Sequence, residues 1–412
     1  MSDHFDTLET RDPAVRERAQ FAALAAQLAH AKAHAPAFAH LLADVDPASV
    51  KNRDALARLP VTRKSELAEL QKAAQPFGGF AATRWGEARR VFASPGPIYE
   101  PESGRPDHWR VARAMYAAGF RPGDLVHNCY AYHHTPAGSM METAAHALGC
   151  TVFPGGVGQT DMQVQAMADL RPDGYVGTPS FLKIILERAD ELGVALPSLR
   201  KALVSGEPFP PALRDALIAR GIAGYQVYAT ADLGMIAYET PAREGLVVDE
   251  GVIVEIVRPG TGDPVAQGEV GEVVVSTLSN TAYPLIRFGT GDLSASMPGA
   301  SPCGRTNLRI RGWLGRADQT TKVKGMFVHP SQVAATLRRH PEIVRGRLVV
   351  DNPDGTDRMT LHVELPANRS AVAAAIVDSL REVTKLRGEV AFHAEGDLPN
   401  DGKVIEDARK YS

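Results

Sequence analysis

The feature that most constrains the fold is a regular alternation of strand-like and helix-like segments between residues 110 and 230. The strand-like segments are short and apolar without strict alternation, which is typical of strands buried on both faces of a parallel sheet. We interpret 125–128, 151–154, 174–177 and 201–204 as strands, and 111–119, 139–148, 161–170 and 181–191 as helices. Strands that alternate with helices of about ten residues predict a largely parallel sheet covered by helices, and therefore an α/β fold.

A second pattern begins at about residue 246. Val252, Val254 and Ile256 recur at every second position, and Pro259-Gly260-Thr261-Gly262 is a turn signal between such runs. Residues 246–296 therefore predict antiparallel hairpins, which we expect to form a β-barrel-like subdomain beside the main sheet.

A third pattern occupies the C-terminal part of the chain. Strand-like stretches at 348–350, 361–363 and 389–391 are interspersed with helical patterns at 331–340 and 369–385. This favours a small α+β domain. The predicted division is a large N-terminal domain, 1–317, and a small C-terminal domain, 318–412.

Size and composition exclude several classes of protein. A chain of 412 residues predicts two or more domains, and its net charge of -3 gives no reason to expect nucleic acid or an anionic membrane as partner. No apolar run approaches the roughly 20 residues that span a bilayer. The acidic N-terminus lacks a secretory pattern, and three widely spaced cysteines favour reduced thiols. These features predict a cytoplasmic protein.

Five short segments carry residue types suited to a nucleotide site. They are Ser205-Gly206-Glu207-Pro208, Tyr228-Ala229-Thr230-Ala231-Asp232, Arg287-Phe288-Gly289-Thr290-Gly291-Asp292, Gly315-Arg316-Ala317-Asp318 and Leu398-Pro399-Asn400-Asp401-Gly402-Lys403. The first follows a predicted strand, and ligands bind at the strand ends of open parallel sheets. Taken singly, each segment also has a structural interpretation, as a turn, a surface ion pair or a solvated charge.

Taken together, these segments resemble the motifs of the adenylate-forming enzymes, and among them the phenylacetate–CoA ligase family. The resemblance extends from about residue 50 to the end of the chain. It implies ATP-dependent activation of a carboxylic acid to an acyl-adenylate, followed by transfer to coenzyme A. It also implies a lid formed by the small domain, a homodimer, and the use of ATP, Mg²⁺ and coenzyme A.

The resemblance assigns roles to residues of the large domain. Ser205, Gly206, Glu207 and Pro208 would line the adenine pocket, and Tyr228 would stack on adenine. Ala229 stands in the nucleotide-binding segment where the family has a glycine, Thr230 would supply the hydroxyl that touches phosphate, and Asp292 would bind the ribose hydroxyls. Asp232 stands where the family has a glutamate that binds magnesium, and Ala231 replaces a hydroxyl residue. A carboxylate suits Mg²⁺, although aspartate is shorter by one methylene.

Three residues near the domain boundary and the C-terminus complete the implied site. Arg316 would contact the ribose or the phosphate, and Asp318 would be the hinge about which the lid rotates. Lys403 would place its ammonium between the substrate carboxylate and the α-phosphate.

One segment departs from the family pattern. The family has a Ser/Thr/Gly-rich loop with a lysine that holds the β- and γ-phosphates, whereas residues 93–101 read Ala-Ser-Pro-Gly-Pro-Ile-Tyr-Glu-Pro. Prolines offer no N–H to a phosphate, and Glu100 puts an anion where a cation is expected. Either other groups hold the triphosphate, or the ligand is a monophosphate, or adenylation has been lost.

The segment after the strand 125–128 contains aromatic residues that could line an acyl pocket. Tyr130, Tyr132, His133 and Phe153 are the candidates, and they favour an aryl or arylacetic acid. His133 and His134 are neighbours on an extended chain and point to opposite faces, so they form a poor metal-chelating pair.

Two functions from different classes remain. The first is an AMP-forming acid–CoA ligase, favoured by Asp292, Arg316, Asp318 and Lys403 together. The second is a non-catalytic relative that binds a nucleotide or an acyl-CoA, favoured by the altered residues 93–101. Another reaction that transfers AMP or CoA is a third possibility.

Overall fold

The computed structural model of the chain describes residues 3–94, 97–317, 319, 321–323, 326–353, 357–365 and 369–409. The chain forms two compact units. One comprises 1–254, 275–288 and 297–313, and the other comprises 255–274, 289–296 and 314–412. Three strands, β11 (Val252–Val257), β12 (Val270–Thr277) and β13 (Phe288–Met297), pass through both units.

The first unit contains the predicted parallel sheet. Its strands are β4 (Leu125–Asn128), β5 (Thr151–Phe153), β6 (Gly174–Gly177), β7 (Lys201–Val204) and β8 (Ala223–Thr230). They lie in the order β8-β7-β6-β4-β5, and every neighbouring pair is parallel. The predicted α/β architecture is confirmed.

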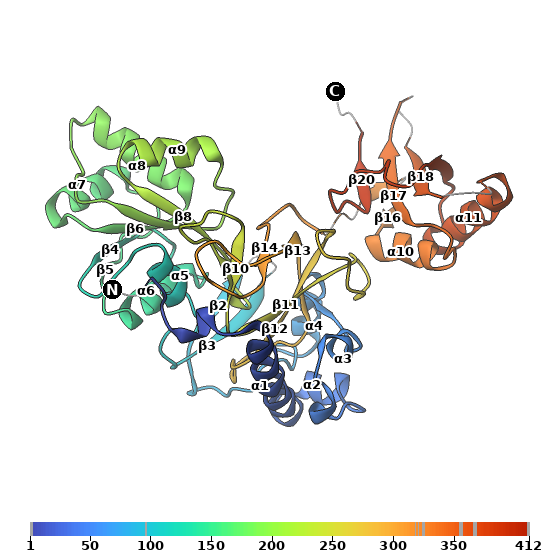
Figure 1. Ribbon diagram of the computed structural model, residues 1–412, viewed down its shortest axis with the longest axis horizontal. Helices are drawn as coiled ribbons and strands as arrows, with labels where there is room; N and C mark the ends of the chain where they lie inside the picture. The colour runs from blue at the N-terminus through green and yellow to red at the C-terminus, as the bar shows by residue number, and fades with distance from the viewer. Residues whose placement is uncertain are drawn as a thin grey trace. The chain divides into compact units, whose positions relative to one another are not determined.

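Helices cover both faces of these parallel strands (Figure 1). They are α5 (Ala112–Ala117) and α6 (Ala137–Ala147) on one face, and α7 (Thr160–Leu170), α8 (Pro179–Glu191) and α9 (Pro211–Ala219) on the other. Successive strand residues point to opposite faces. Accordingly, Val176 packs in one core with Met141 of α6, whereas Tyr175 packs in another with Leu182 of α8. Burial on both faces explains the continuous apolar runs in the sequence.

The large sheet continues beyond β8 with a change of direction. β9 (Gly234–Tyr238) is antiparallel to β8, and β10 (Leu246–Val248) pairs antiparallel with both β9 and β14 (Arg309–Ile310). The order β10-β14-β13-β12-β11 completes the sheet, and β1 (Thr62–Arg63) pairs with β13.

The strands expected in a β-barrel-like subdomain therefore belong to the edge of the large mixed sheet. The strands themselves form as predicted, but the described residues contain no separate closed barrel. Every residue of β11 and β12 is buried, so both faces of these strands are covered. The period of two in the sequence predicted strands, but it carries no information about how the sheet closes.

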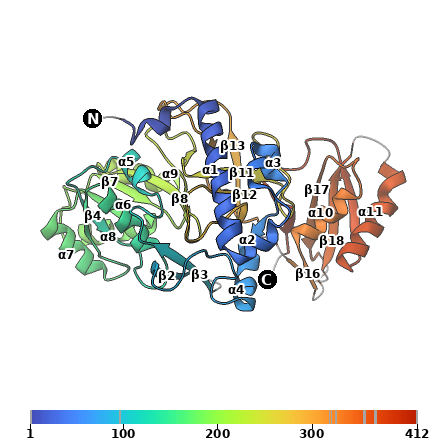
Figure 2. The ribbon, with the colours of Figure 1, turned by 90° about the horizontal axis from the view of Figure 1, so that it is seen from below.

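The N-terminal residues add helices and a hairpin to the first unit. The helices are α1 (Pro13–His34), α2 (Pro36–Leu41), α3 (Arg53–Ala57) and α4 (Lys64–Ala73), and the hairpin joins β2 (Ala88–Ser94) to β3 (Ile98–Ser103). The Asp12 side chain caps α1 by accepting from the amides of Ala14 and Val15. Helices α1 and α2 lie side by side in Figure 1 and Figure 2. No helix in the described part of the chain is long and apolar enough to cross a bilayer.

The C-terminal part of the second unit is the predicted α+β fold. A sheet in the order β19-β18-β17-β20 packs with two helices around one apolar core. Its elements are β17 (Arg345–Asp351), β18 (Arg358–Glu364), β19 (Glu389–His393), β20 (Ile405–Asp407), α10 (Pro330–Arg338) and α11 (Arg369–Thr384), preceded by the hairpin β15 (Thr321–Val323) to β16 (Met326–Val328). The domain boundary at 317/318 falls inside this second unit and stays a prediction.

Candidate functional site

Two of the predicted nucleotide segments meet at the carboxyl ends of neighbouring parallel strands. Ser205 directly follows β7, and Tyr228, Ala229 and Thr230 end β8. The Ser205 hydroxyl donates to the carbonyl oxygen of Val227 at 2.7 Å, which ties the two segments together. The strand order therefore brings together residues that lie more than twenty positions apart in the sequence.

The loop after β7 turns sharply. Gly206 has a φ of +86°, a conformation that residues with a Cβ adopt at a cost. The Glu207 carboxylate accepts from the Ser180 amide in the first turn of α8 at 2.6 Å. A carboxylate at a helix N-terminus is favourable, so Glu207 stabilises the loop. Pro208 is exposed beside it.

Tyr130, one of the predicted acyl-pocket residues, adjoins this loop. Its side chain is fully buried, which raises the pKa of its hydroxyl, and Ser205 and Glu207 are among the neighbours that influence that pKa. The Tyr132 hydroxyl accepts from the Asn128 side chain at 2.8 Å. His133 is exposed.

Phe153 packs with a histidine that sequence reasoning missed. Its ring stacks on His127, with 5.0 Å between ring centroids, and burial lowers the pKa of His127. Because the Gln163 amide group donates to the Gly155 carbonyl oxygen, its oxygen accepts from His127 Nε2 at 2.6 Å. This bond assigns the proton of the neutral imidazole to Nε2. The sequence could have indicated a buried histidine, because His127 lies inside a segment predicted to be a strand of a parallel sheet.

Asp232 is buried against a cation that the sequence did not reveal. The Lys64 ammonium, in the first turn of α4, lies 2.5 Å from Asp232 Oδ2. The Asp232 side chain is inaccessible, whereas the Lys64 side chain is 21% exposed. The two residues are 168 positions apart, so only the fold could reveal their contact.

Glu100 adjoins this ion pair and is a neutral acid at neutral pH. Burial, followed by the charge of Asp232, raises its pKa to about 8, and its Oε1 accepts from the Ser94 hydroxyl at 2.5 Å. Glu100 Oε2 and Asp232 Oδ1 are both buried without a hydrogen-bond partner among the described residues. The nearby Asp232 carboxylate favours the protonated form of Glu100. The anion expected from the sequence at this position is removed by burial. Pro95 and Gly96 of the same segment lie outside the described residues.

A magnesium ion does not fit Asp232 in this arrangement. Mg²⁺ takes oxygen ligands in octahedral geometry and retains several waters, whereas the accessible partner of Asp232 is an ammonium group. The described residues contain no group of three or more His, Cys, Asp or Glu side chains that could hold a metal. The cation beside Asp232 in this structure is the ammonium group of Lys64.

In the second unit, the structure brings Asp292 and Arg316 together. Arg316 Nη1 donates to Asp292 Oδ1 at 2.9 Å and to the Thr290 carbonyl oxygen at 3.3 Å. The Asp292 side chain is 11% exposed and that of Arg316 is 50% exposed, so the guanidinium keeps an accessible face. Gly291 has a φ of +74°, and a Cβ there would lie 2.7 Å from Arg316 Nη2. Two residues that were predicted separately as nucleotide ligands thus contact each other beside a left-handed glycine in β13.

Arg287, from the same sequence motif, has a structural role. Its side chain is 1% exposed, and Nη1 donates to the carbonyl oxygens of Ala57 and Leu59 at 2.7 and 2.5 Å. These bonds satisfy backbone groups at the end of α3 and just after it. The motif therefore contributes one structural arginine and one candidate ligand.

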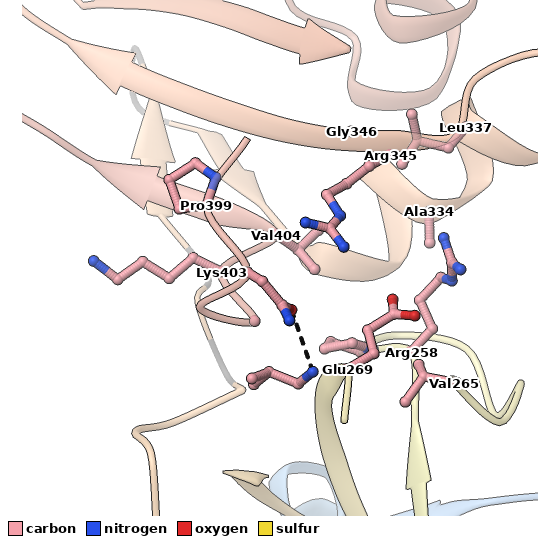
Figure 3. Close-up of a pocket in the computed structure, with 14 residues that line it drawn as sticks. Arg258, Val265, Glu269, Ala334, Leu337, Arg345, Gly346, Pro399, Lys403 and Val404 are labelled. Atoms are coloured by element: carbon pink, nitrogen blue, oxygen red, sulfur yellow. Dashed lines mark hydrogen bonds between the residues drawn. The ribbon is translucent and has the colours of Figure 1, made fainter. Parts of the chain in front are cut away.

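Lys403 borders a small cavity of about 60 Å³ within the second unit (Figure 3). The lining includes Arg258, Glu269, Arg345 and Gly402, whereas Asp292 is not part of it. The Lys403 side chain is exposed and extends away from this cavity. Asp292 therefore does not line the cavity that Lys403 borders. Asp318 lies outside the described residues, so its predicted hinge role stays a prediction.

Comparisons with known proteins agree with this geometry. A family model described as AMP-binding enzyme matches residues 108–282. The phenylacetate–coenzyme A ligase of Thermus thermophilus is 34% identical over 338 residues, which are 78% of this chain and 75% of that protein. The Escherichia coli K12 phenylacetate–coenzyme A ligase is 30% identical over 378 residues, 87% of this chain and 85% of that protein.

A solved structure extends the similarity to the whole chain. The crystal structure of a 2-hydroxyisobutyryl-CoA ligase in complex with 2-HIB-AMP and CoA matches with a TM-score of 0.71 and 26% identity. The match covers 99% of this chain and 93% of that one.

Proposed function

Because the chain belongs to the phenylacetate–coenzyme A ligase family of AMP-binding enzymes, we propose that it activates an aryl or arylacetic acid with ATP and transfers the acyl group to coenzyme A. The observation that carries the proposal is the junction of the Ser205 and Tyr228 segments at adjacent strand ends. In open α/β sheets this edge is where nucleotides bind.

The first half-reaction forms the acyl-adenylate. A carboxylate oxygen of the acid attacks the α-phosphorus of ATP, the bond to the β-phosphate oxygen breaks, and pyrophosphate leaves. Asp292 accepts hydrogen bonds from the ribose hydroxyls, and the accessible face of Arg316 binds the ribose or phosphate. Lys403 stabilises the charge that develops between the carboxylate and the α-phosphate.

The second half-reaction forms the thioester. The thiolate sulfur of coenzyme A attacks the acyl carbonyl carbon, and AMP leaves with the electrons of the C–O bond. A turn of the lid about Asp318 would remove Lys403 from the site and admit the thiol. The proton of the thiol passes to solvent or to AMP.

The altered residues 93–101 do not oppose the use of ATP in the way the sequence suggested. A neutral Glu100 and an Asp232 paired with Lys64 carry no net charge together, so they do not repel a triphosphate. Ser94 is buried and donates its hydroxyl to Glu100, so it is not a phosphate donor in this state. We therefore propose that groups other than Ser94 and Glu100 hold the β- and γ-phosphates.

Pyrophosphate release with a panel of aryl, arylacetic and short-chain acids, with and without coenzyme A, tests this function. We expect release with one class of aryl acid, and Lys403→Ala should lower its rate by roughly 10²-fold or more because the charge acts in the transition state. The acid KM should change much less. If ATP or AMP binds but no acid releases pyrophosphate, the non-catalytic alternative favoured by residues 93–101 is correct.

Two further proposals concern the acid pocket and the oligomeric state. Binding of the acid beside Tyr130 and Tyr132 predicts protection of these side chains by substrate. A cytoplasmic homodimer is also proposed, and light scattering at working concentration tests its stoichiometry.

A further inference from the structure

The side chain of Gln319 makes four hydrogen bonds to backbone groups on either side of Lys403 and before the predicted hinge. Its Oε1 accepts from the amides of Val404 at 2.5 Å and Ile405 at 2.8 Å. Its Nε2 donates to the carbonyl oxygens of Gly402 at 3.2 Å and Arg316 at 3.4 Å. The side-chain amide of Gln319 therefore connects Arg316, which pairs with Asp292, to the segment that carries Lys403.

The segment 398–404 belongs to no helix or strand, and it is held at several points besides Gln319. The Leu398 amide donates to Glu364 Oε1 at 2.7 Å, and the Val404 carbonyl oxygen accepts from the Leu348 amide of β17 at 2.8 Å. The Asp401 carboxylate accepts from the Lys403 amide at 3.1 Å and from Arg347 at 2.9 Å. The bonds from Gln319 enclose Lys403, with one at the residue before it and two at the residues after it.

We propose that Gln319 is a positioning residue that fixes the backbone around Lys403, so that the lysine moves with the beginning of the lid as one body. The proposal depends on the proposed function for the role of Lys403. Glutamine suits the position because its side chain both donates and accepts, whereas glutamate only accepts and lysine only donates. A turn at residue 318 would break the bond to Arg316 and leave the bonds to residues 402, 404 and 405 intact.

Amide exchange in the full-length protein tests the contact without any substrate. Gln319→Ala should speed deuterium exchange at Val404 and Ile405 by about 10-fold, because each amide loses its acceptor. Gln319→Glu retains the acceptor and should stay within about 3-fold of the wild-type rate.

Gln332→Ala is the matched control. Gln332 accepts from the His329 amide and donates to the Val383 carbonyl oxygen, so its loss disturbs the same domain away from residues 402–405. It should leave exchange at Val404 and Ile405 unchanged. Equal exchange in Gln319→Ala and wild type would overturn the proposal.

The kinetic effect separates positioning from general destabilisation. Gln319→Ala should lower kcat for pyrophosphate release by about 10-fold or more, with the KM values of ATP and acid within about 3-fold, because the binding residues are untouched. Gln319→Glu should recover part of kcat. Faster exchange with an unchanged kcat would exclude a positioning role. If the wild type releases no pyrophosphate, the proposed function fails, while exchange still decides whether Gln319 holds this segment.

Discussion

At the residue scale, the cluster formed by Lys64, Glu100 and Asp232 determines the charge of Glu100 in the altered segment 93–101. Three ionisable groups are packed together, with Glu100 and Asp232 fully buried. Two buried carboxylates beside one ammonium would leave an uncompensated negative charge, so Glu100 retains its proton. A glutamate at position 100 would be charged in a solvent-exposed loop and would repel phosphate. In this fold its side chain is uncharged, so this repulsion is absent.

The cluster predicts a pH-dependent stability. The pKa of Glu100 is raised from 4.5 to about 8 in the folded state, so the folded protein binds more protons than the unfolded chain between these values. Stability contributed by the neutral acid is present below pH 4.5 and is lost as pH rises through about 8. Glu100→Gln cannot ionise and keeps a donor for Asp232. Its Tm should exceed that of the wild type by an amount that grows up to about pH 8 and is constant above it.

Thermal unfolding across this pH range checks the prediction. The exposed Glu69→Gln variant removes a carboxylate of the same type from the surface and should leave the pH dependence unchanged. A Tm difference between Glu100→Gln and wild type that does not vary with pH would contradict a buried neutral acid.

At the element scale, a left-handed glycine inside β13 places the candidate nucleotide ligands. Gly291 adopts a left-handed conformation, and the Asp292 amide donates to the Thr290 hydroxyl at 3.1 Å. The Arg316 guanidinium packs over the glycine, where no side chain intervenes. The left-handed conformation of Gly291 within β13 therefore leaves the space in which the Arg316 guanidinium reaches the Asp292 carboxylate.

A comparison of Gly291→Ala with Gly299→Ala should separate the effect of backbone strain from the effect of displacing Arg316. A Cβ at 2.7 Å from Arg316 Nη2 forces the guanidinium to move, and we expect AMP binding to weaken by about 5- to 10-fold, as expected for loss of one charged hydrogen bond. Gly299→Ala is the control, because its φ is +75° but the nearest atom to its Cβ is 3.9 Å away. Both variants should lose about 1 kcal/mol of stability. Calorimetric titration with AMP should distinguish them, and equal affinities would reject the steric argument.

At the scale of the whole molecule, the predicted reaction requires the lid to serve two half-reactions. The segment carrying Lys403 belongs to the second unit together with Asp292 and Arg316, yet Asp292 does not line the cavity that Lys403 borders. A hinge between the two half-reactions must absorb a large change of φ and ψ.

Asp318→Pro should therefore slow thioester formation more than adenylation, by roughly 10-fold in the ratio of the two rates, because proline fixes φ. Pyrophosphate release and thioester formation are measured separately on the same preparation. Asp318→Ala removes the carboxylate but leaves the backbone free, so it should keep the ratio near that of the wild type. A uniform loss in both half-reactions of Asp318→Pro would argue against a hinge at this position.

Several parts of the molecule were determined by the sequence itself. The strands β4, β6 and β7 lie where short, largely apolar runs predicted them, because a strand buried on both faces lacks a regular alternation of apolar and polar residues. Ser205, Tyr228 and Asp292 could be identified as candidate site residues from the sequence, because each lies in a segment with a recognisable turn or strand-end pattern. The α+β character of the C-terminal residues was likewise predicted, because helix and strand periods differ.

Only the tertiary structure decided the electrostatics and the contacts across the chain. The pairing of Lys64 with Asp232 and the protonation of Glu100 depend on burial and on neighbours from distant segments, which a linear pattern does not encode. The strands at 252–277 extend the large sheet because pairing partners and closure depend on the packing of whole faces. The bonds of Gln319 to Gly402, Val404 and Ile405 join residues more than eighty positions apart, so the fold alone brings them together.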